Sequence, residues 1–267
     1  MSDTLDVGAF VPGDGSVPVV LLGAFPMGMD FWRPMTEVRL RQHAEHELQT
    51  PFYAFEYPGF GLSPPSNAEP ALEAIAAAAV ETLHTVIGAD RAVWLGCSLG
   101  GYTAMAIAEA NPEVVHGLGL IDTRSEADSE QIRQTRLTIA SEFDDIPVHP
   151  SARVEAERLT GVPKDRRAVV VDVVTDLIEN EDPSAMAWLQ RAMAARPDRT
   201  AVLRSLDAPI VVIRGEVDAI VPPHVAEEMA EAARTTVTTI PRSGHLPPIE
   251  DPEATLAALE PLLEPLG

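Results

Sequence analysis

Short, mostly apolar runs alternate along the chain with longer segments whose apolar residues recur at steps of three and four. The longer pattern is that of an amphipathic helix, and Leu72, Ile75, Ala79 and Leu83 show it between residues 70 and 87. The short runs are rich in Val, Ile and Leu, which is typical of strands buried on both faces of a parallel sheet. They occupy residues 17–22, 51–55, 92–95, 114–121, 209–213 and 236–240. The alternation predicts an α/β protein with a mostly parallel central sheet and helices on both faces.

This alternation is interrupted after Asp122. Between residues 124 and 204 we find only helical patterns broken by prolines, and one of them places Val169 and Val173 on its expected apolar face. A β/α alternation with such a gap indicates a helical insertion into the chain of a parallel sheet. We therefore predict an α/β core formed by residues 1–123 and 205–267, and a helical insertion formed by residues 124–204.

The composition fits one soluble α/β domain and gives no sign of a membrane segment. Of the 267 residues, 46% are hydrophobic and 5% aromatic, which suits a single core with room for a subdomain. No apolar run approaches the ~18 residues that a membrane helix needs. The acidic first residues lack a basic and then apolar leader, and the single cysteine, Cys97, permits no intrachain disulfide. We therefore expect a cytoplasmic protein.

A formal net charge of −22 argues against two classes of partner. Nucleic acids and anionic membrane surfaces both require basic patches, whereas acidic residues are spread along this chain. An anionic ligand would be repelled unless a local basic pocket receives it. The segment His43-Ala44-Glu45-His46 differs from the H-E-x-x-H zinc motif and no third ligand accompanies it, so we expect no metal and no cofactor.

One stretch carries a pattern with chemical meaning, Gly96-Cys97-Ser98-Leu99-Gly100-Gly101. It lies between an apolar strand and an Ala-rich helix, where a G-x-S-x-G turn exposes the serine hydroxyl above the sheet. Glycine-rich turns in this position also bind phosphates or only reverse the chain. A nucleophilic Ser98 therefore needs a base and an acid elsewhere in the chain. The neighbouring Cys97 should point into the core, which predicts a buried and unreactive thiol.

His245 is the histidine best placed to act as the base. It follows the last predicted strand, and the carboxyl ends of parallel strands meet at one edge of a sheet. Asp218 and Asp122 also follow strands, and either carboxylate could orient the imidazole. We prefer Asp218, because its glycine-bearing loop gives more freedom to meet a histidine, and keep Asp122 as the alternative acid. The order serine, acid, histidine agrees with the strand–turn–helix architecture.

Together these residues give the chain a resemblance to the α/β-hydrolase superfamily over nearly its full length. Residues 21–26 resemble the family's strand followed by H-G-x-P, and residues 56–63 resemble D-x-P-G-x-G-x-S. Residues 96–101 match the nucleophile elbow, while 215–218 and 243–245 resemble the acid and histidine loops. The resemblance implies the α/β-hydrolase fold, with the insertion 124–204 as a helical cap over the site.

Two departures from the family's pattern lie in neighbouring loops. Gly23-Ala24 stands where the family has His-Gly in its oxyanion loop, and Glu56 stands where it has Asp. The resemblance implies an oxyanion hole of backbone N–H groups, which Phe25 and Leu99 can supply without that histidine. An apolar acyl pocket below the cap is expected, with ordinary core as the alternative, from a further set of residues. They are Met27, Met29, Phe31 and Trp32.

The type of nucleophile narrows the chemistry that the resemblance implies. Relatives that open epoxides or remove halide carry Asp at the elbow, and members like dienelactone hydrolase carry Cys. With Ser98 we expect a serine hydrolase of small carboxylic esters or lactones, acting through an acyl-enzyme. Cofactor-free haloperoxidase or perhydrolase chemistry, carbon–carbon bond hydrolysis and a non-catalytic small-ligand binding protein are the alternatives on this fold. The expected partner is a small-molecule substrate, and a homo-oligomer is compatible with the sequence.

Overall fold

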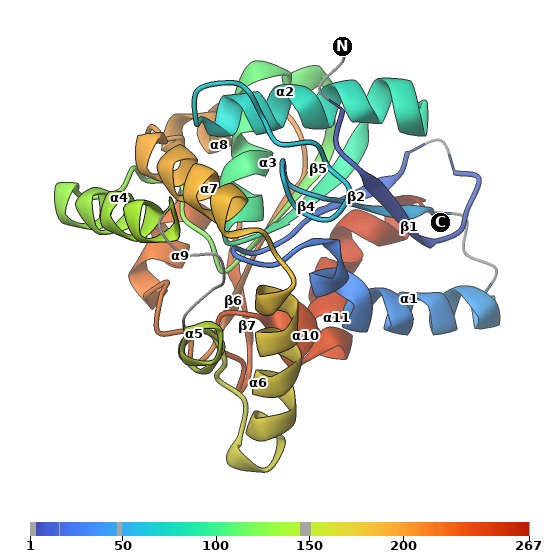
Figure 1. The fold of residues 1–267 in the computed structure, drawn as a ribbon. Helices are drawn as coiled ribbons and strands as arrows, with labels where there is room; N and C mark the ends of the chain where they lie inside the picture. Colours follow the sequence, from blue (N-terminus) through green and yellow to red (C-terminus); the bar gives the residue numbers. More distant parts are fainter. Residues whose placement is uncertain (1–3, 16, 47–49, 145–150, 267) are drawn as a thin grey trace.

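The computed structural model describes residues 4–15, 17–46, 50–144 and 151–266, and its centre is a seven-stranded sheet (Figure 1). The strand order is β1-β3-β2-β4-β5-β6-β7. β1 runs antiparallel to β3, and the other neighbouring pairs are parallel, which confirms the predicted sheet. The strands are β1 (Val7–Val11), β2 (Val19–Leu22), β3 (Phe52–Phe55), β4 (Ala92–Cys97), β5 (Val115–Ile121), β6 (Ile210–Gly215) and β7 (Val237–Ile240).

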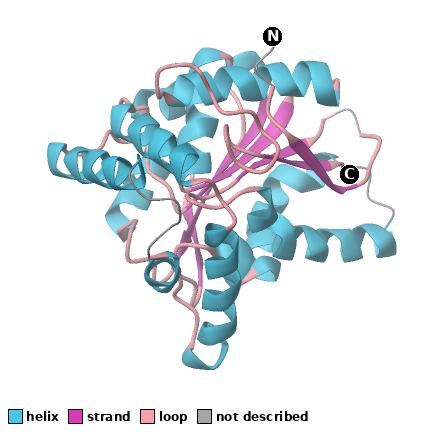
Figure 2. Ribbon diagram, viewed as in Figure 1, coloured by secondary structure: helices cyan, strands magenta, loops and turns pink. Residues whose placement is uncertain are grey.

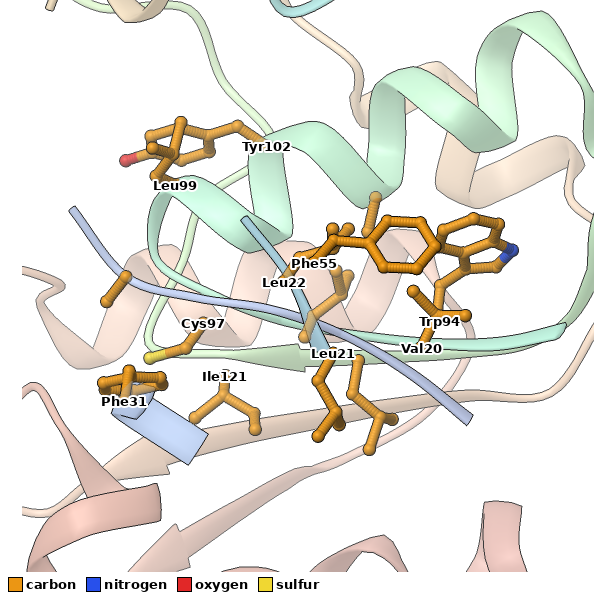
Figure 3. Packing of buried hydrophobic residues seen from close by; sticks show 14 of the residues in the cluster. Val20, Leu21, Leu22, Phe31, Phe55, Trp94, Cys97, Leu99, Tyr102 and Ile121 are labelled. Carbon is orange, nitrogen blue, oxygen red and sulfur yellow. The ribbon is translucent and has the colours of Figure 1, made fainter. Parts of the chain in front are cut away.

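The central strands are buried on both faces, because helices cover the sheet above and below (Figure 2). Trp94 and Phe55 point to the side of α3 (Leu99–Ala110), and their rings meet edge to face with centroids 6.2 Å apart. Figure 3 shows Ile121 on the opposite side of the sheet. Each fully buried side chain of this kind contributes about 1.5–3 kcal/mol to stability. The continuous apolar runs of the sequence thus follow from burial on two sides.

The helices of the core form two layers. α1 (Arg33–His46) and α11 (Pro252–Leu263) pack together on one face of the sheet. On the other face α2 (Leu72–Thr82) packs against α3, and α8 (Thr200–Ser205) contacts both α3 and α9 (Pro223–Ala232). Among the described residues, no helix combines the length and the apolar character needed to cross a membrane.

The chain between β5 and β6 holds the helices of the predicted insertion. They are α4 (Glu130–Asp144), α5 (Ala152–Leu159), α6 (Lys164–Glu179) and α7 (Pro183–Ala195). α4 packs against α7 and α5 against α6, and Figure 1 shows them grouped beside the sheet. The described part of residues 124–204 contains no strand. α8 contacts α3 and α9, so this helix belongs to the helical layer of the core. The division of the chain at residue 204 stays a prediction.

Candidate active site

Ser98 lies in the tight turn between β4 and α3, with its backbone at φ 52° and ψ −110°. Few non-glycine residues adopt a positive φ, and such strain persists only where the surroundings enforce it. The flanking glycines explain how the turn closes. A Cβ on Gly100 would lie 1.9 Å from the carbonyl oxygen of Leu22, and one on Gly96 would lie 2.3 Å from the backbone of Gly100. The sheet and helix therefore hold Ser98 in this partly buried turn.

The side chains of Ser98, His245 and Asp218 form a hydrogen-bonded row. His245, in the loop between β7 and α10 (Pro247–Glu250), places Nε2 2.9 Å from Ser98 Oγ. Its Nδ1 lies 2.9 Å from Asp218 Oδ2. His245 and Asp218 are both buried, at 3% and 6% exposure, so water does not compete for these contacts. The three residues that the sequence analysis selected as nucleophile, base and acid thus meet at one edge of the sheet.

Asp122 and Asp218 lie next to each other, and their different surroundings shift the pKa values of the two carboxyl groups in opposite directions. Burial alone would raise the pKa of Asp218, but the charge and hydrogen bond of His245 and further donors lower it to about 2. Burial and the neighbouring Asp218 charge raise the pKa of Asp122 well above its usual value. Both oxygens of Asp122 accept the N–H of Gly215, at 3.0 and 3.1 Å. Asp218 is therefore the ionised carboxylate that contacts the imidazole, and Asp122 supports it from behind.

The loop after β2 keeps its shape without the histidine that the family's pattern has there. The buried Tyr57 hydroxyl donates to the carbonyl oxygen of Gly23, at 2.6 Å. The Glu56 carboxylate accepts the N–H of Met29, at 3.0 Å, so this residue braces the loop as expected. Leu99 is the first residue of α3, and its N–H is one of the groups that a helix start leaves without an intrahelical partner.

Comparison with known proteins agrees with this geometry. A family model described as the alpha/beta hydrolase family matches residues 10–259. The chain belongs to this family. Because the match spans both the elbow and the histidine loop, it covers every residue of the row described above.

Relatives of this alpha/beta hydrolase include named esterases. The pimeloyl-[acyl-carrier protein] methyl ester esterase of Pectobacterium atrosepticum is 25% identical over 261 residues, covering 91% of this chain and 92% of the relative. A malate-bound thermophilic esterase from Thermogutta terrifontis has a TM-score of 0.87 at 28% identity, covering 98% of this chain and 94% of that one. The enol-lactonase from Burkholderia xenovorans LB400 has a TM-score of 0.82 at 20% identity, with 97% of both chains covered, and shows the fold. The chain is a hydrolase.

A cavity of about 560 Å³ opens beside Ser98 and His245 in this hydrolase. The insertion supplies much of its wall, and apolar side chains such as Phe25 and Met193 line it together with charged ones. The arginines on the wall already have partners. Arg136 bonds to the buried Asp128, Arg158 bonds to Glu155, and Arg124 donates to the carbonyl oxygen of Ile220, at 2.7 Å. The charged part of the wall is thus largely neutralised within the protein.

The prediction of which residues form the apolar acyl pocket is wrong. Met27, Phe31 and Trp32 are fully buried in the core, Met29 packs against that core, and none of the four lines the cavity. The short 3-10 turn Met29–Trp32 directs Phe31 and Trp32 inward, where their rings meet edge to face with centroids 5.0 Å apart. Phe31 appears near Cys97, on the side of the sheet away from α3 (Figure 3). The alternative of ordinary core is the correct one.

Sequence reasoning missed Arg214, which shapes the loop of the catalytic-acid candidate. This buried residue near the end of β6 donates to the carbonyl oxygens of Val221, Glu216 and Asp218, at 2.9, 3.1 and 3.1 Å. The three bonds fold the loop around the guanidinium, and the loop presents Asp218 to His245. A charged residue inside an otherwise apolar strand was the available signal, since arginine is seldom buried without partners.

A metal ion has one candidate cluster within the described ranges of the chain. Asp122, Asp218 and His245 can each offer a ligand atom, and these atoms lie within 4.8 Å of one another. Nδ1 of His245 and Oδ2 of Asp218 already bond to each other, and Oδ1 of Asp218 accepts the N–H of Ile220, at 2.7 Å. The ligand atoms of Asp218 and His245 are therefore already engaged in hydrogen bonds within the protein. We assign these two residues to the hydrogen-bonded row.

The thiol of Cys97 adjoins Ser98 in the sequence, and a substitution can test whether it takes part in the reaction. It is fully buried, and burial raises the pKa of the Cys97 thiol well above its usual value. A protonated, buried thiol is a poor nucleophile. We expect Cys97→Ala to keep ester hydrolysis within about threefold of the parent, because the change removes a small core contact and one weak bond of the thiol to the carbonyl oxygen of His245, at 3.7 Å. Steady-state kinetics on a chromogenic ester measures this, and a loss as large as that caused by removing Ser98 Oγ would contradict it.

Proposed function

We propose that this chain is a serine hydrolase of small carboxylic esters or lactones, acting through an acyl-enzyme on Ser98. The observation that carries the proposal is the row Ser98 Oγ, His245, Asp218, with 2.9 Å at each contact. A serine hydroxyl attacks a carbonyl at neutral pH only when a base removes its proton, and the base works best when a carboxylate fixes its tautomer. Both conditions are supported by this geometry.

In the proposed mechanism, Nε2 of His245 accepts the Ser98 proton while Oγ forms a bond to the substrate carbonyl carbon. Asp218 accepts the Nδ1–H and stabilises the imidazolium. When the tetrahedral intermediate collapses, the ester C–O bond breaks and the imidazolium returns its proton to the leaving alcohol. Water then attacks the acyl-enzyme by the same steps and releases the acid. In a lactone the leaving alcohol stays attached to the acyl group.

The negative charge of the intermediate needs donors that are already in place. We assign this role to the backbone N–H groups of Leu99 and Phe25. Leu99 starts α3, whose helix dipole adds positive potential at that end, and Phe25 lines the cavity together with Ser98. Each donor of this kind contributes on the order of 3 kcal/mol to lowering the barrier.

The cavity supports a small ester or lactone as the proposed substrate class. Its volume of about 560 Å³ suits a small molecule, and pockets of roughly 300–1,000 Å³ hold drug-sized ligands. Its arginines are engaged with Asp128, Glu155 and a backbone carbonyl, so an acyl group without net charge meets the lower desolvation cost. The names of the relatives from P. atrosepticum and T. terrifontis, both esterases, support the ester as the reacting bond.

The proposal is tested by mixing the protein with 4-nitrophenyl acetate and following nitrophenolate release within the first turnovers. A burst close to one equivalent, with an acetyl group on the peptide that contains Ser98 in the mass spectrum, is the expected result. Ligand binding without any acyl adduct would overturn the proposal in favour of a binding protein. Turnover that requires peroxide and halide, with no ester hydrolysis, would overturn it in favour of haloperoxidase chemistry.

A further inference from the structure

The loop that carries His245 is held from below by a buried carboxylate, that of Glu250. This residue ends the short helix α10 and is 1% exposed. Its Oε2 accepts the N–H of Gly244, at 2.8 Å, and its Oε1 accepts the N–H of Leu246, at 3.1 Å. These two residues flank His245 on either side. One carboxylate therefore fixes the backbone immediately before and immediately after the proposed base.

The same carboxylate reaches the helical insertion. Glu250 Oε2 also accepts the N–H of Gly161, at 3.0 Å, two residues after α5 ends. The carbonyl oxygen of Leu159, the last residue of α5, accepts the N–H of His245 itself, at 3.0 Å. In addition, the Arg166 guanidinium donates to the backbone carbonyl of Glu250. The end of α5 and the histidine loop are thus joined by bonds through the residues that surround His245.

Two glycines bring these backbones into direct contact. A Cβ on Gly161 would lie 2.5 Å from Gly244 Cα, and a Cβ on Gly244 would lie 2.4 Å from the nitrogen of Gly161. Such distances are shorter than any normal carbon contact, so neither position accepts a side chain without movement. Since α5 also lines the cavity through Glu155 and Arg158, this junction joins a wall of the cavity to the loop of the base.

The charge of Glu250 acts on the imidazole as well. Burial raises the pKa of the Glu250 carboxyl above its usual value, while its three N–H donors and the attraction of a protonated His245 oppose that rise. The other titratable groups that face His245 are Asp218, Asp122, the Cys97 thiol and, from the cavity wall, Arg158.

We propose that Glu250 is a positioning residue for His245: its carboxylate fixes the histidine loop on both sides of the base and joins that loop to the end of α5. The inference rests on the proposed function, in which His245 moves the proton. It assigns a role to a carboxylate outside the row of Ser98, His245 and Asp218. It also makes the insertion part of the support of the base, in addition to a wall of the cavity.

The test compares Glu250→Gln with Glu253→Gln, an exposed glutamate of α11 whose side chain is 67% exposed. A glutamine keeps the shape but turns an NH₂ group towards backbone N–H donors, which leaves at least one of them without an acceptor. We expect kcat for the ester to fall by about 10–100-fold with KM changed little, since small misplacements of a reacting group have such effects.

Hydrogen exchange gives a readout that does not depend on turnover. In Glu250→Gln the amides of residues 243–246 and of Gly161 should exchange at least about tenfold faster than in the parent and in Glu253→Gln. A folded Glu250→Gln protein with the parent's kcat and exchange rates would overturn the inference. A parent protein that never acylates Ser98 would contradict the proposed function, and the exchange rates would still decide the role of Glu250 in the junction.

A second variant keeps the test open if Glu250→Gln does not fold. Gly161→Ala leaves the carboxylate in place but forces the end of α5 away from Gly244. We expect kcat to fall by about tenfold and the exchange of residues 243–246 to quicken, because the histidine loop is displaced while the carboxylate remains. Parent-like kcat and exchange in Gly161→Ala would contradict a supporting role of the insertion.

Discussion

Replacing Ser98 with Ala is expected to lower kcat for ester hydrolysis by at least about 10³-fold and to abolish labelling by a fluorophosphonate. The change removes only Oγ, the atom that lies 2.9 Å from His245 Nε2. Alanine meets the same steric strain as serine at φ 52°, so the turn and the fold should persist. The measurement is steady-state hydrolysis of 4-nitrophenyl acetate together with fluorescence of the labelled protein.

The matched control is Ser141→Ala, which removes an exposed hydroxyl from α4, remote from the row of reacting side chains. This variant should keep the parent's rate and label. Thermal unfolding of both variants separates a lost nucleophile from a lost fold, since Ser98→Ala should melt close to the parent. A Ser98→Ala protein that retains most of the activity would remove the basis of the proposed mechanism.

Exchanging Asp218 for Asn should be nearly as damaging as losing the nucleophile, with kcat lower by about 10⁴-fold. The Asp218 carboxylate accepts the Nδ1–H of His245, and an asparagine can instead present its NH₂ group there. The imidazole then carries its proton on Nε2, where it must accept the serine proton, so the base is in the wrong tautomer. The kcat of the purified variant on the same ester measures this effect.

Asp122→Asn is the matched control for the acid, and we expect activity within about tenfold of the parent. Because burial and the neighbouring Asp218 raise the pKa of Asp122, its protonated form is favoured, and an uncharged amide resembles that form. The asparagine oxygen can accept the N–H of Gly215 while its NH₂ group faces Asp218. A severe loss in Asp122→Asn together with an active Asp218→Asn would reverse the assignment of the acid.

The sequence predicted the parts of this molecule that depend on local order along the chain. Apolar runs marked five of the strands, because strands buried on both faces leave few polar positions, whereas β7 was predicted although Thr238 and Thr239 are exposed. Ser98, Asp218 and His245 could be brought together before any coordinates were known, since each follows a parallel strand and such strands end at one edge. The role of the elbow glycines could also be predicted, because close approach between strand and helix leaves no room for a Cβ.

What depends on packing between distant segments could not be predicted in the same way. β1 was missed because Val7–Val11 contains a glycine and lies at the antiparallel edge, where only its last residue, Val11, is fully buried. In α6, Val169 and Val173 are 67% and 42% exposed although the pattern placed them on the apolar face. Which face of an insertion helix meets the core is set by its neighbours. Met27, Phe31 and Trp32 were misassigned for the same reason, since apolarity does not distinguish a cavity wall from a core.

The contact between Gly161 and Gly244 has a consequence for attempts to change substrate preference by exchanging segments between relatives. A chimera that receives a foreign insertion would need a glycine at the position of Gly161, or the incoming side chain would collide with the histidine loop. It would also need a backbone N–H there to occupy the third bond of Glu250. Segment grafts cut after Arg166 keep this glycine and the guanidinium that donates to Glu250, and they leave the rest of α6 and α7 free to vary. The placement of the cut, more than the choice of donor, decides whether such a hybrid retains a working base.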